Sequence, residues 1–231
     1  MKKVVYRTDF LKPSLTVDLV VLGYQDNELF VLLIRRLLDP FKDLWALPGG
    51  FVLGDETLAE AAKRELEEET GVSEIHLEQL HTFDEPGRDP RGRVITVAHL
   101  ALVKPSLHLL KPSGDATEAK WFKLRELPVL AFDHRAILKA GIERIKNKIR
   151  HEPLAFELLP KEFTLTHLQE LFELILEEKL DKRNFRKKVI DLDLLEEIDF
   201  EVKTPYRRPQ YYEFRKDEFK KRMKDGFRFE L

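Results

Sequence analysis

Short apolar runs fill the first part of the chain, and their length is typical of β-strands. They occupy residues 16–22, 29–35, 45–47, 75–83, 94–103 and 121–122. The polar residues between the first two runs, Gln25-Asp26-Asn27-Glu28, predict a hairpin turn. The run at 94–103, VITVAHLALV, is almost wholly apolar, so we expect it to lie inside a sheet.

Two segments instead repeat apolar residues at helical spacing. In the first, Leu58, Ala62 and Leu66 share one face. Either Asp55 or Thr57 is suited to cap its start, and Gly71 is suited to cap its end. The second segment spans residues 134–149, and its apolar face consists of Ile137, Leu138, Gly141, Ile142 and Ile145. Strands on both sides of one helix, closed by a second helix, predict a mixed α/β sandwich.

The last third of the chain has its own pattern, and the helical periodicity before it stops near 151–160. A helix with an apolar face is predicted from Thr164 or Thr166 to Leu176. After a break, a second helix is predicted from Asp181 to Ile198, with one apolar face. The apolar residues of that face are Phe185, Val189, Leu192 and Leu195. A ribbon of strands at 200–203 and 210–214, joined by a turn, follows.

This order of elements is that of a winged helix-turn-helix: a helix, a break, a basic helix and a two-stranded ribbon. In such a domain the second helix enters the DNA major groove. Lys179 to Lys188 carries six bases and one acid, so the basic residues are segregated. The alternative is a helical hairpin with a solvated basic surface. We predict a first domain at 1–152 and a DNA-binding domain at 153–231. The candidate DNA-binding residues are Lys182, Arg183, Asn184, Arg186, Lys187, Arg207 and Arg208.

Composition narrows the functional classes. The chain has 231 residues and no cysteine, which excludes a disulfide framework and thiol chemistry. Its 40 basic and 42 acidic residues nearly balance, so there is no global attraction to nucleic acid. No signal peptide or membrane-length apolar run is present, and we expect a cytoplasmic protein without a membrane partner.

Three acidic residues on the first predicted helix are the main candidates for chemistry. Glu65, Glu68 and Glu69 stand at positions i, i+3 and i+4, so they lie on one helix face. Like charges at this spacing repel by roughly 0.2–0.5 kcal/mol per pair. A divalent cation relieves that repulsion, and hard carboxylate oxygens suit Mg²⁺ or Mn²⁺. The alternative is a solvated acidic face, but the cluster follows Gly49-Gly50, where backbone carbonyls can approach a metal.

The spacing of this segment resembles the signature of the Nudix hydrolases. Nine specified positions match without departure: Gly50, Glu56, Arg64-Glu65-Leu66, Glu68-Glu69 and Gly71-Val72. The resemblance implies an α/β/α sandwich with a mixed sheet. It also implies metal ligation by Glu65, Glu68, Glu69 and the Gly50 carbonyl. Glu56 and Arg64 would form an orienting ion pair in such a site. Members of the family cleave nucleoside diphosphates linked to another group, using metal-activated water.

Two loops of the first domain are candidates for ligand binding. Residues 84–93, DEPGRDPRGR, are either a polar hairpin loop or a diphosphate clamp, since arginine binds phosphate bidentately. The clamp interpretation makes Arg88, Arg91, Arg93 and Phe51 ligand-binding residues. Pro86 stands at the place of a proline in the ADP-ribose-binding branch of Nudix proteins, which this segment resembles. The second loop, 104–117, contains or adjoins the candidate general bases Asp115 and Glu118.

The pairing of the two domains resembles the NrtR-like regulators. The segments LLPKEFTLTHLQELFE, LDKRNFRKKV and YRRPQYYEF carry this resemblance. It implies a repressor of NAD-metabolism genes that binds a double-stranded operator and senses ADP-ribose. We also expect a homodimer, because helix-turn-helix proteins commonly bind paired half-sites about a two-fold axis. Many members have an eroded Nudix signature and only bind the ligand, whereas every catalytic position is present here. The alternative is therefore an active, Mg-dependent ADP-ribose pyrophosphatase with a C-terminal accessory domain.

Overall fold

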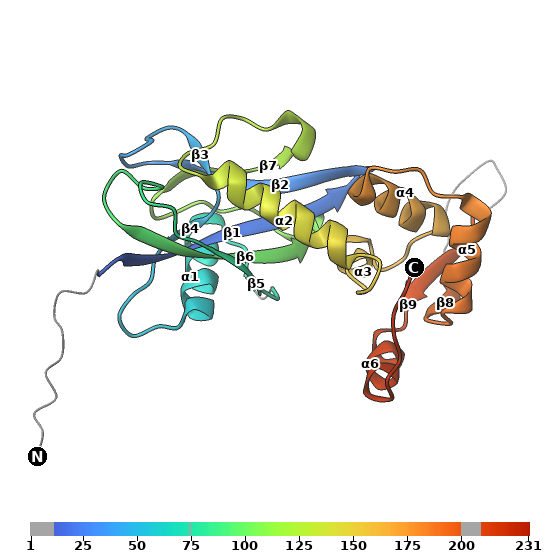
Figure 1. Cartoon of the computed structure of the whole chain (residues 1–231). Helices are drawn as coiled ribbons and strands as arrows, with labels where there is room; N and C mark the ends of the chain where they lie inside the picture. Colours follow the sequence, from blue (N-terminus) through green and yellow to red (C-terminus); the bar gives the residue numbers. More distant parts are fainter. Residues whose placement is uncertain (1–11, 74, 200–208) are drawn as a thin grey trace, which may run out of the picture.

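The computed structural model describes residues 12–73, 75–199 and 209–231. Its first part is a mixed sheet between helix α1 (Leu58–Thr70) and helix α2 (His134–Lys148), as predicted (Figure 1). The strands are β1 (Ser14–Gln25), β2 (Glu28–Arg36), β3 (Trp45–Ala46), β4 (Gly49–Phe51), β5 (Glu78–Phe83), β6 (Val94–Val103) and β7 (Ala116–Lys123). Two short 3-10 turns, η1 (Pro105–Leu107) and η2 (Leu124–Glu126), flank β7.

The sheet has the order β3-β2-β1-β6-β5, with β4 paired to β1 and β7 paired to β2. Only β1 and β6 run parallel among the paired strands of the described residues. Asp26 and Asn27 both have positive φ and join β1 to β2, which confirms the predicted hairpin. The sequence pattern missed β4 and most of β7, because β4 is only three residues long and contains two glycines.

Alternate residues of β1 supply the cores on the two faces of the sheet. Val17, Leu19 and Val21 pack in one cluster with Ala61, Ala62 and Leu66 of α1. Val20 and Leu22 pack in the other with α2 residues such as Ile137 and Ile145. Gly141 lets α2 approach the sheet closely, because a Cβ there would lie 2.7 Å from Val20 Cγ1. The sheet is therefore covered on both faces.

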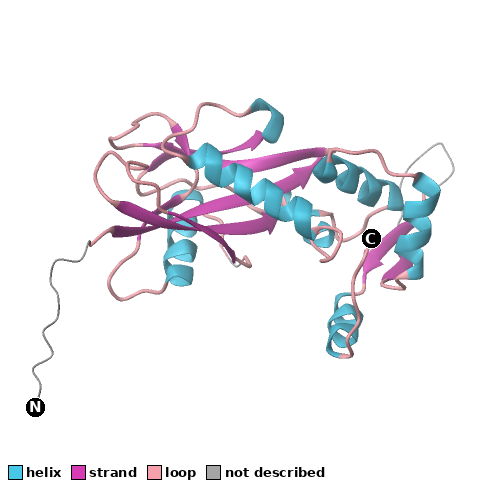
Figure 2. Cartoon of the chain, viewed as in Figure 1, coloured by secondary structure: helices cyan, strands magenta, loops and turns pink. Residues whose placement is uncertain are grey.

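The second part begins with α3 (Ala155–Leu158), α4 (Leu165–Leu176) and α5 (Lys182–Asp191). A two-stranded ribbon of β8 (Leu195–Ile198) and β9 (Tyr211–Phe214) follows, and then α6 (Lys216–Lys224) (Figure 2). Thr164 caps α4 and Asp181 caps α5 through their side-chain oxygens, as predicted. The predicted ribbon strand at 200–203 and the turn to residue 208 lie outside the described residues.

The predicted length of the second helix is wrong. The helix ends at Asp191, and Leu195–Ile198 forms a strand paired to β9. Asp191 and Asp193 oppose the helix dipole at this end. Asp193 adopts a positive φ of 50°, and its carboxylate accepts hydrogen bonds from Arg215 and Arg222. The chain therefore turns here and leaves Leu195 on the ribbon.

The two parts share one continuous apolar cluster that runs from β1 and α2 to α4, α5 and the C-terminal Leu231. Phe156 stacks on Phe214 with ring centroids 4.1 Å apart. The Leu231 amide donates to the Arg150 carbonyl at 2.9 Å. The turn between β1 and β2 also reaches α4, where Asn27 donates to Glu170 at 3.1 Å. Within the described residues, no helix is long and apolar enough to cross a membrane.

Candidate functional site

The cavity at the Nudix signature lies where β1 and β2 separate. Near the hairpin β1 pairs with β2, but Thr16 to Asp18 pair with β4 instead. A cavity of about 370 Å³ opens there, between the end of β4, helix α1 and loop 84–93. Gly49 of β4 is needed for this packing, whereas a side chain at Gly50 would displace only the flexible end of Glu65. A Cβ on Gly49 would lie 2.1 Å from the Val17 carbonyl oxygen, and one on Gly50 would lie 2.3 Å from Glu65 Oε1.

The start of α1 is tied to β4 by the predicted ion pair. Arg64 donates to both oxygens of Glu56, at 2.9 Å from Nε and 2.6 Å from Nη2. These hydrogen bonds, together with one from the Leu53 amide, lower the pKa of Glu56 to about 2. Arg64 also donates to the Phe51 carbonyl at 3.1 Å and to Glu65 at 2.8 Å. One guanidinium therefore holds β4, the loop before α1 and the acidic face of α1 together.

The three acidic side chains of the signature differ in their environments. Glu69 is buried, accepts a hydrogen bond from the Gly49 amide at 2.8 Å, and has its pKa raised to about 8 by burial. Burial also raises the pKa of Glu65. The Glu68 side chain is 55% exposed and reaches Arg64 at 3.3 Å. All three line the cavity, from its interior to its mouth.

The residues around Gly50 suit a divalent cation by their chemistry. They offer carboxylate and carbonyl oxygens, and burying Glu69 as a charged group is unfavourable without a nearby cation. Among the described residues, however, no three acidic or histidine side chains are arranged to hold a metal as they stand. The Arg64 guanidinium instead contacts Glu65 and Glu68. Metal binding at this site would therefore require Glu65 and Glu68 to give up their contacts with Arg64.

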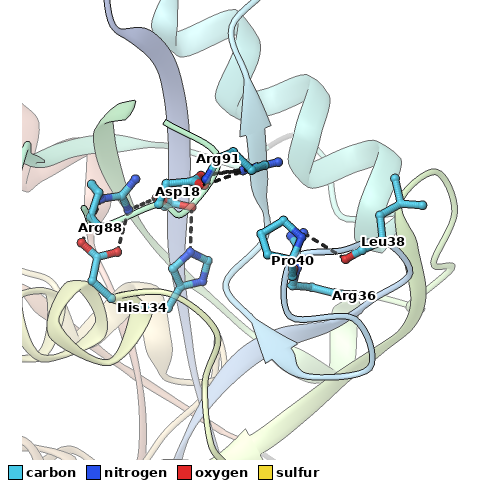
Figure 3. Close-up of polar contacts among 9 residues, drawn as sticks. Asp18, Arg36, Leu38, Pro40, Arg88, Arg91 and His134 are labelled. Carbon is cyan, nitrogen blue, oxygen red and sulfur yellow. Dashed lines mark hydrogen bonds and ion pairs between the residues drawn. The ribbon is translucent and has the colours of Figure 1, made fainter. Parts of the chain in front are cut away.

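The floor of the cavity contains a buried polar network that the sequence did not reveal (Figure 3). Arg88 donates to Asp133 at 2.6 and 2.9 Å and to Asp18 at 3.2 Å. The Leu47 amide donates to His134 Nδ1 at 2.9 Å, so the Nε2 proton faces Asp18 Oδ1, 3.3 Å away. Burial lowers the pKa of His134, which keeps the imidazole neutral. The network joins β1, the end of β3, loop 84–93 and the start of α2.

The three arginines of loop 84–93 that were predicted to bind a ligand differ in their positions relative to the cavity. Arg88 and Arg91 line the cavity, but the Arg88 side chain is 4% exposed and already paired with two carboxylates. Arg91 is paired with the buried Asp89 at 2.7 Å. Arg93 does not line the cavity and donates to the Asp84 carbonyl. Phe51 lies at the mouth, 41% exposed.

The second predicted loop contributes one side of the cavity mouth. Asp115 lines the cavity, whereas Glu118 is exposed on β7 and does not. Ser113 donates to the Glu68 carbonyl, and the Lys111 amide donates to the Thr70 carbonyl at 2.8 Å. These bonds hold the loop against the last turn of α1. Of the two candidate general bases, only Asp115 is near the signature carboxylates.

A second candidate site is the surface of α5. Phe185 and Val189 are buried, and Phe185 lies 5.2 Å from the Phe172 ring of α4. The opposite side exposes polar and basic side chains, which are Lys182, Arg183, Asn184, Lys187 and Lys188. Arg186 was expected to be exposed, but it is half-buried and donates to Thr166 at 2.9 Å. Arg207 and Arg208 lie outside the described residues.

The turn between α4 and α5 is held by one carboxylate. Glu173 accepts hydrogen bonds from Lys179 Nζ at 2.6 Å, Gln169 at 2.9 Å and the Leu180 amide at 3.1 Å. These bonds lower the pKa of Glu173 to about 2. They set the angle at which α5 leaves α4, so the basic face of α5 is presented by a defined helix-turn-helix.

Comparison with known proteins identifies both parts of the chain. The family described as "NUDIX domain" matches residues 12–142, and the "NrtR DNA-binding winged helix domain" matches residues 155–214. The chain is 37% identical to "ADPR responsive transcriptional repressor NtrR" of Acinetobacter baylyi, over 90% of this chain and 84% of that protein. It is 42% identical to "ADP-ribose pyrophosphatase" of Methanocaldococcus jannaschii, over 60% of this chain and 82% of that protein.

The whole architecture also matches a solved structure. The crystal structure of Shewanella oneidensis NrtR complexed with a 27mer DNA aligns with a TM-score of 0.77 and 33% identity. The alignment covers 93% of this chain and 97% of that chain, so it includes both the sheet domain and the winged helix. The chain therefore belongs to the Nudix family, in the NrtR-like branch that joins a Nudix domain to a DNA-binding winged helix.

Proposed function

We propose that this protein is a transcriptional repressor that binds operator DNA through α5. It responds to ADP-ribose or a related nucleotide, which binds in the Nudix cavity. The observation that carries the proposal is the joining of a helix-turn-helix with an exposed basic helix to an intact Nudix cavity through one shared core. The similarity to the A. baylyi repressor over 90% of the chain supports it. We further propose that it acts in the cytoplasm, as a homodimer, on genes of NAD metabolism.

The proposed domains are residues 1–152 and 153–231, which places the boundary between the end of α2 at Lys148 and the start of α3 at Ala155. The connection between the two domains is rigid, because Phe163 and Leu168 of the second domain belong to the same apolar cluster as Ile145 of the first. A change in the sheet domain can therefore be transmitted to α4 and α5 without a flexible linker. A ligand in the Nudix cavity can control DNA binding only if such a change reaches α4 and α5.

The proposed DNA contacts follow from exposure on α5. Lys182, Arg183, Asn184 and Lys187 are free to reach bases or phosphates. We place the proposed DNA contact of Arg186 at the edge of this surface, because its guanidinium also donates a hydrogen bond to Thr166. Arg207 and Arg208 remain proposed phosphate contacts of the wing.

The proposed cation is Mg²⁺ or Mn²⁺, and Glu65, Glu68, Glu69 and the Gly50 carbonyl would hold it. When bound, such an ion polarises a phosphoryl oxygen and lowers the pKa of water. The chain's own contribution is positional. Arg64 and Glu56 keep α1 against β4, and Asp115 stands at the mouth as a candidate general base. The catalytic assignments of Glu56, Arg64, Glu65, Glu68 and Glu69 rest on this arrangement.

A second candidate function is hydrolysis of ADP-ribose to AMP and ribose 5-phosphate. The complete set of signature residues and the 42% identity to the M. jannaschii pyrophosphatase favour it. The two functions are compatible, because a repressor that slowly cleaves its ligand still responds to it. Hydrolysis would be supported if the protein cleaves ADP-ribose with Mg²⁺ and Glu68→Gln abolishes this turnover. If the unaltered protein shows no turnover, its Nudix domain acts only as a ligand sensor.

A DNA mobility shift with the protein's own upstream region tests the repressor proposal. We expect a shifted complex without ligand and its release as ADP-ribose is added. A protein carrying Arg183→Ala and Lys187→Ala should shift the same DNA poorly, while Lys139→Ala, on the exposed side of α2, should behave as the unaltered protein. No complex under any condition, or a complex that ADP-ribose leaves unchanged, would contradict the proposal.

A further inference from the structure

A second cavity lies where the sheet domain meets the winged helix, beside the contact of α3 with β6 (Figure 1). Its volume is about 800 Å³, which is typical of small-molecule sites. The sheet domain contributes the start of β5 and the end of β6, and the second domain contributes residues from 153 to 157 and Lys216 of α6. None of its described lining residues lines the Nudix cavity. We call it the junction cavity, and a ligand in it would contact both domains.

Apolar side chains contribute much of the lining of the junction cavity. They are Ile75, Leu100, Leu102, Val103, Pro153 and Leu154. Leu100 belongs to the apolar cluster shared by the two domains, and Leu102 and Leu154 pack against that cluster, so the lining is held in place. Leu102 and Leu154 are only half-buried, which leaves apolar surface for a ligand to cover.

The acidic side chains of the junction cavity are already paired with bases of the chain. The salt-bridge distances are 2.6 Å for Glu78–Arg144, 3.0 Å for Glu152–Lys148 and 3.0 Å for Glu157–Lys216. A carboxylate that is paired in this way has little attraction left for a further cation. The junction cavity is therefore a poor site for a cationic ligand.

Lys104, the residue after β6, is in the opposite situation. Its side chain lines the junction cavity and is half-buried, yet it forms no salt bridge or hydrogen bond with another described residue. Burial lowers the pKa of Lys104, and Glu157 and Glu162 act on it only from a distance. Removing an ammonium group from water without a partner is unfavourable. An anion in the cavity would supply the missing partner.

Lys104 also borders a third cavity, of about 590 Å³, on the side of the β1–β2 hairpin. Asp26 and Glu162 line that cavity, and among the described residues neither forms a salt bridge, so they would repel an anion. In the junction cavity, by contrast, Lys216 is close enough to Lys104 for the two ammonium groups to repel each other. An anion between the two lysines relieves this repulsion, which favours the junction cavity over the third one.

We propose that the junction cavity is a binding site for a small aliphatic carboxylate, which pairs with Lys104 and covers Leu102 and Leu154. One half-buried lysine supplies a single charge, whereas phosphate sites use several donors and commonly arginine. The described lining residues include no arginine, and no Phe, Tyr or Trp on which a nucleobase stacks. The ligand is therefore unlike a nucleotide, and the inference goes beyond the proposed function without depending on it. Because the ligand contacts both domains, its binding favours the arrangement of domains seen here.

The test is an NMR titration of the full chain with hexanoate, and with hexanol and hexylammonium as probes of the same length. Hexanoate should bind about fivefold more tightly than hexanol, because the carboxylate gains an ion pair, and hexylammonium should bind most weakly. Lys104→Met keeps the length of the side chain but removes its charge, so it should abolish the preference for hexanoate over hexanol. Lys139→Met, on the exposed side of α2, should keep that preference.

Two exposed serines locate the ligand, because each lines only one of the two cavities at Lys104. Ser73→Trp at the junction cavity should block hexanoate, and Ser106→Trp at the third cavity should leave its affinity unchanged. Both variants should fold because both side chains are exposed, and thermal melting checks this. Four results would overturn the proposal: no binding of hexanoate, equal binding of hexanol, an unchanged preference in Lys104→Met, or a block by Ser106→Trp instead of Ser73→Trp.

Discussion

Replacing Arg88 by methionine should destabilise the sheet domain strongly, although the residue lies in a polar surface loop by sequence. The Arg88 side chain is 4% exposed, and its partners Asp18 and Asp133 are 8% and 24% exposed. Removing one partner of a buried ion pair costs roughly 3–5 kcal/mol, because the other charge stays buried and unpaired. Asp18 keeps His134 as a donor and Asp133 is partly hydrated, so we expect the lower end, about 3 kcal/mol.

Urea unfolding followed by tryptophan fluorescence measures this effect. Both tryptophans, Trp45 and Trp121, lie in the sheet domain and report its unfolding. A loss of about 3 kcal/mol corresponds to a lower melting temperature by about 6–12 °C for a chain of this size. Adding Asp18→Asn to Arg88→Met should restore part of the loss, because the unpaired charge is then removed.

Arg125→Met is the matched control, since its side chain is 61% exposed and pairs with Glu28 and Glu126 at the surface. Exposed pairs contribute less than about 1 kcal/mol. Two results would contradict this reasoning: an Arg88→Met variant that loses no more free energy of unfolding than Arg125→Met, or a further loss when Asp18→Asn is added. Either would show that the Arg88 network does not stabilise the sheet domain as its geometry indicates. Arg88 would then be available to bind a ligand, as the loop composition suggested.

Three further predictions follow from the same structure. Arg183→Ala should weaken operator binding by about 1–3 kcal/mol in a mobility shift without changing the melting temperature. Arg186→Ala should weaken operator binding and also lower the melting temperature, because the hydrogen bond to Thr166 is lost. Since burial raises the pKa of Glu69 to about 8, stability without divalent cations should fall as pH rises from about 4.5 to 8, and Glu69→Gln should flatten that profile in urea unfolding. If ADP-ribose lowers operator affinity, operator DNA must lower ADP-ribose affinity by the same factor in calorimetric titrations, and identical ligand affinities with and without DNA would exclude the coupling.

The parts of the fold that could be predicted are those set by local chemistry. The hairpin at Asp26-Asn27, the Thr57 and Asp181 caps, and the Gly71 C-cap with φ of 76° all occur where the sequence places them. The Glu56–Arg64 pair was expected from the family spacing, and it forms because Arg64, in the middle of α1, reaches back to Glu56 in the loop before the helix. Helix α6 was missed, since Phe219 and Met223 are its only apolar residues and none of its residues is buried.

The polar residues at the cavity that could not be predicted depend on contacts between distant segments. Asp18, Asp133 and His134 are ordinary polar residues in the sequence, and no spacing relates them to Arg88. They meet because β1 turns from β2 to β4 at Asp18, while α2 begins at His134 beside the same point. The same topology sets the surroundings of the arginines in loop 84–93. The composition of this loop left a polar hairpin and a diphosphate clamp both open, and Asp18 and Asp133, 70 and 45 positions from Arg88, neutralise that residue. A charged residue of a loop can thus be paired by carboxylates that lie far away in the sequence, and only the tertiary fold shows which arginine is paired in this way.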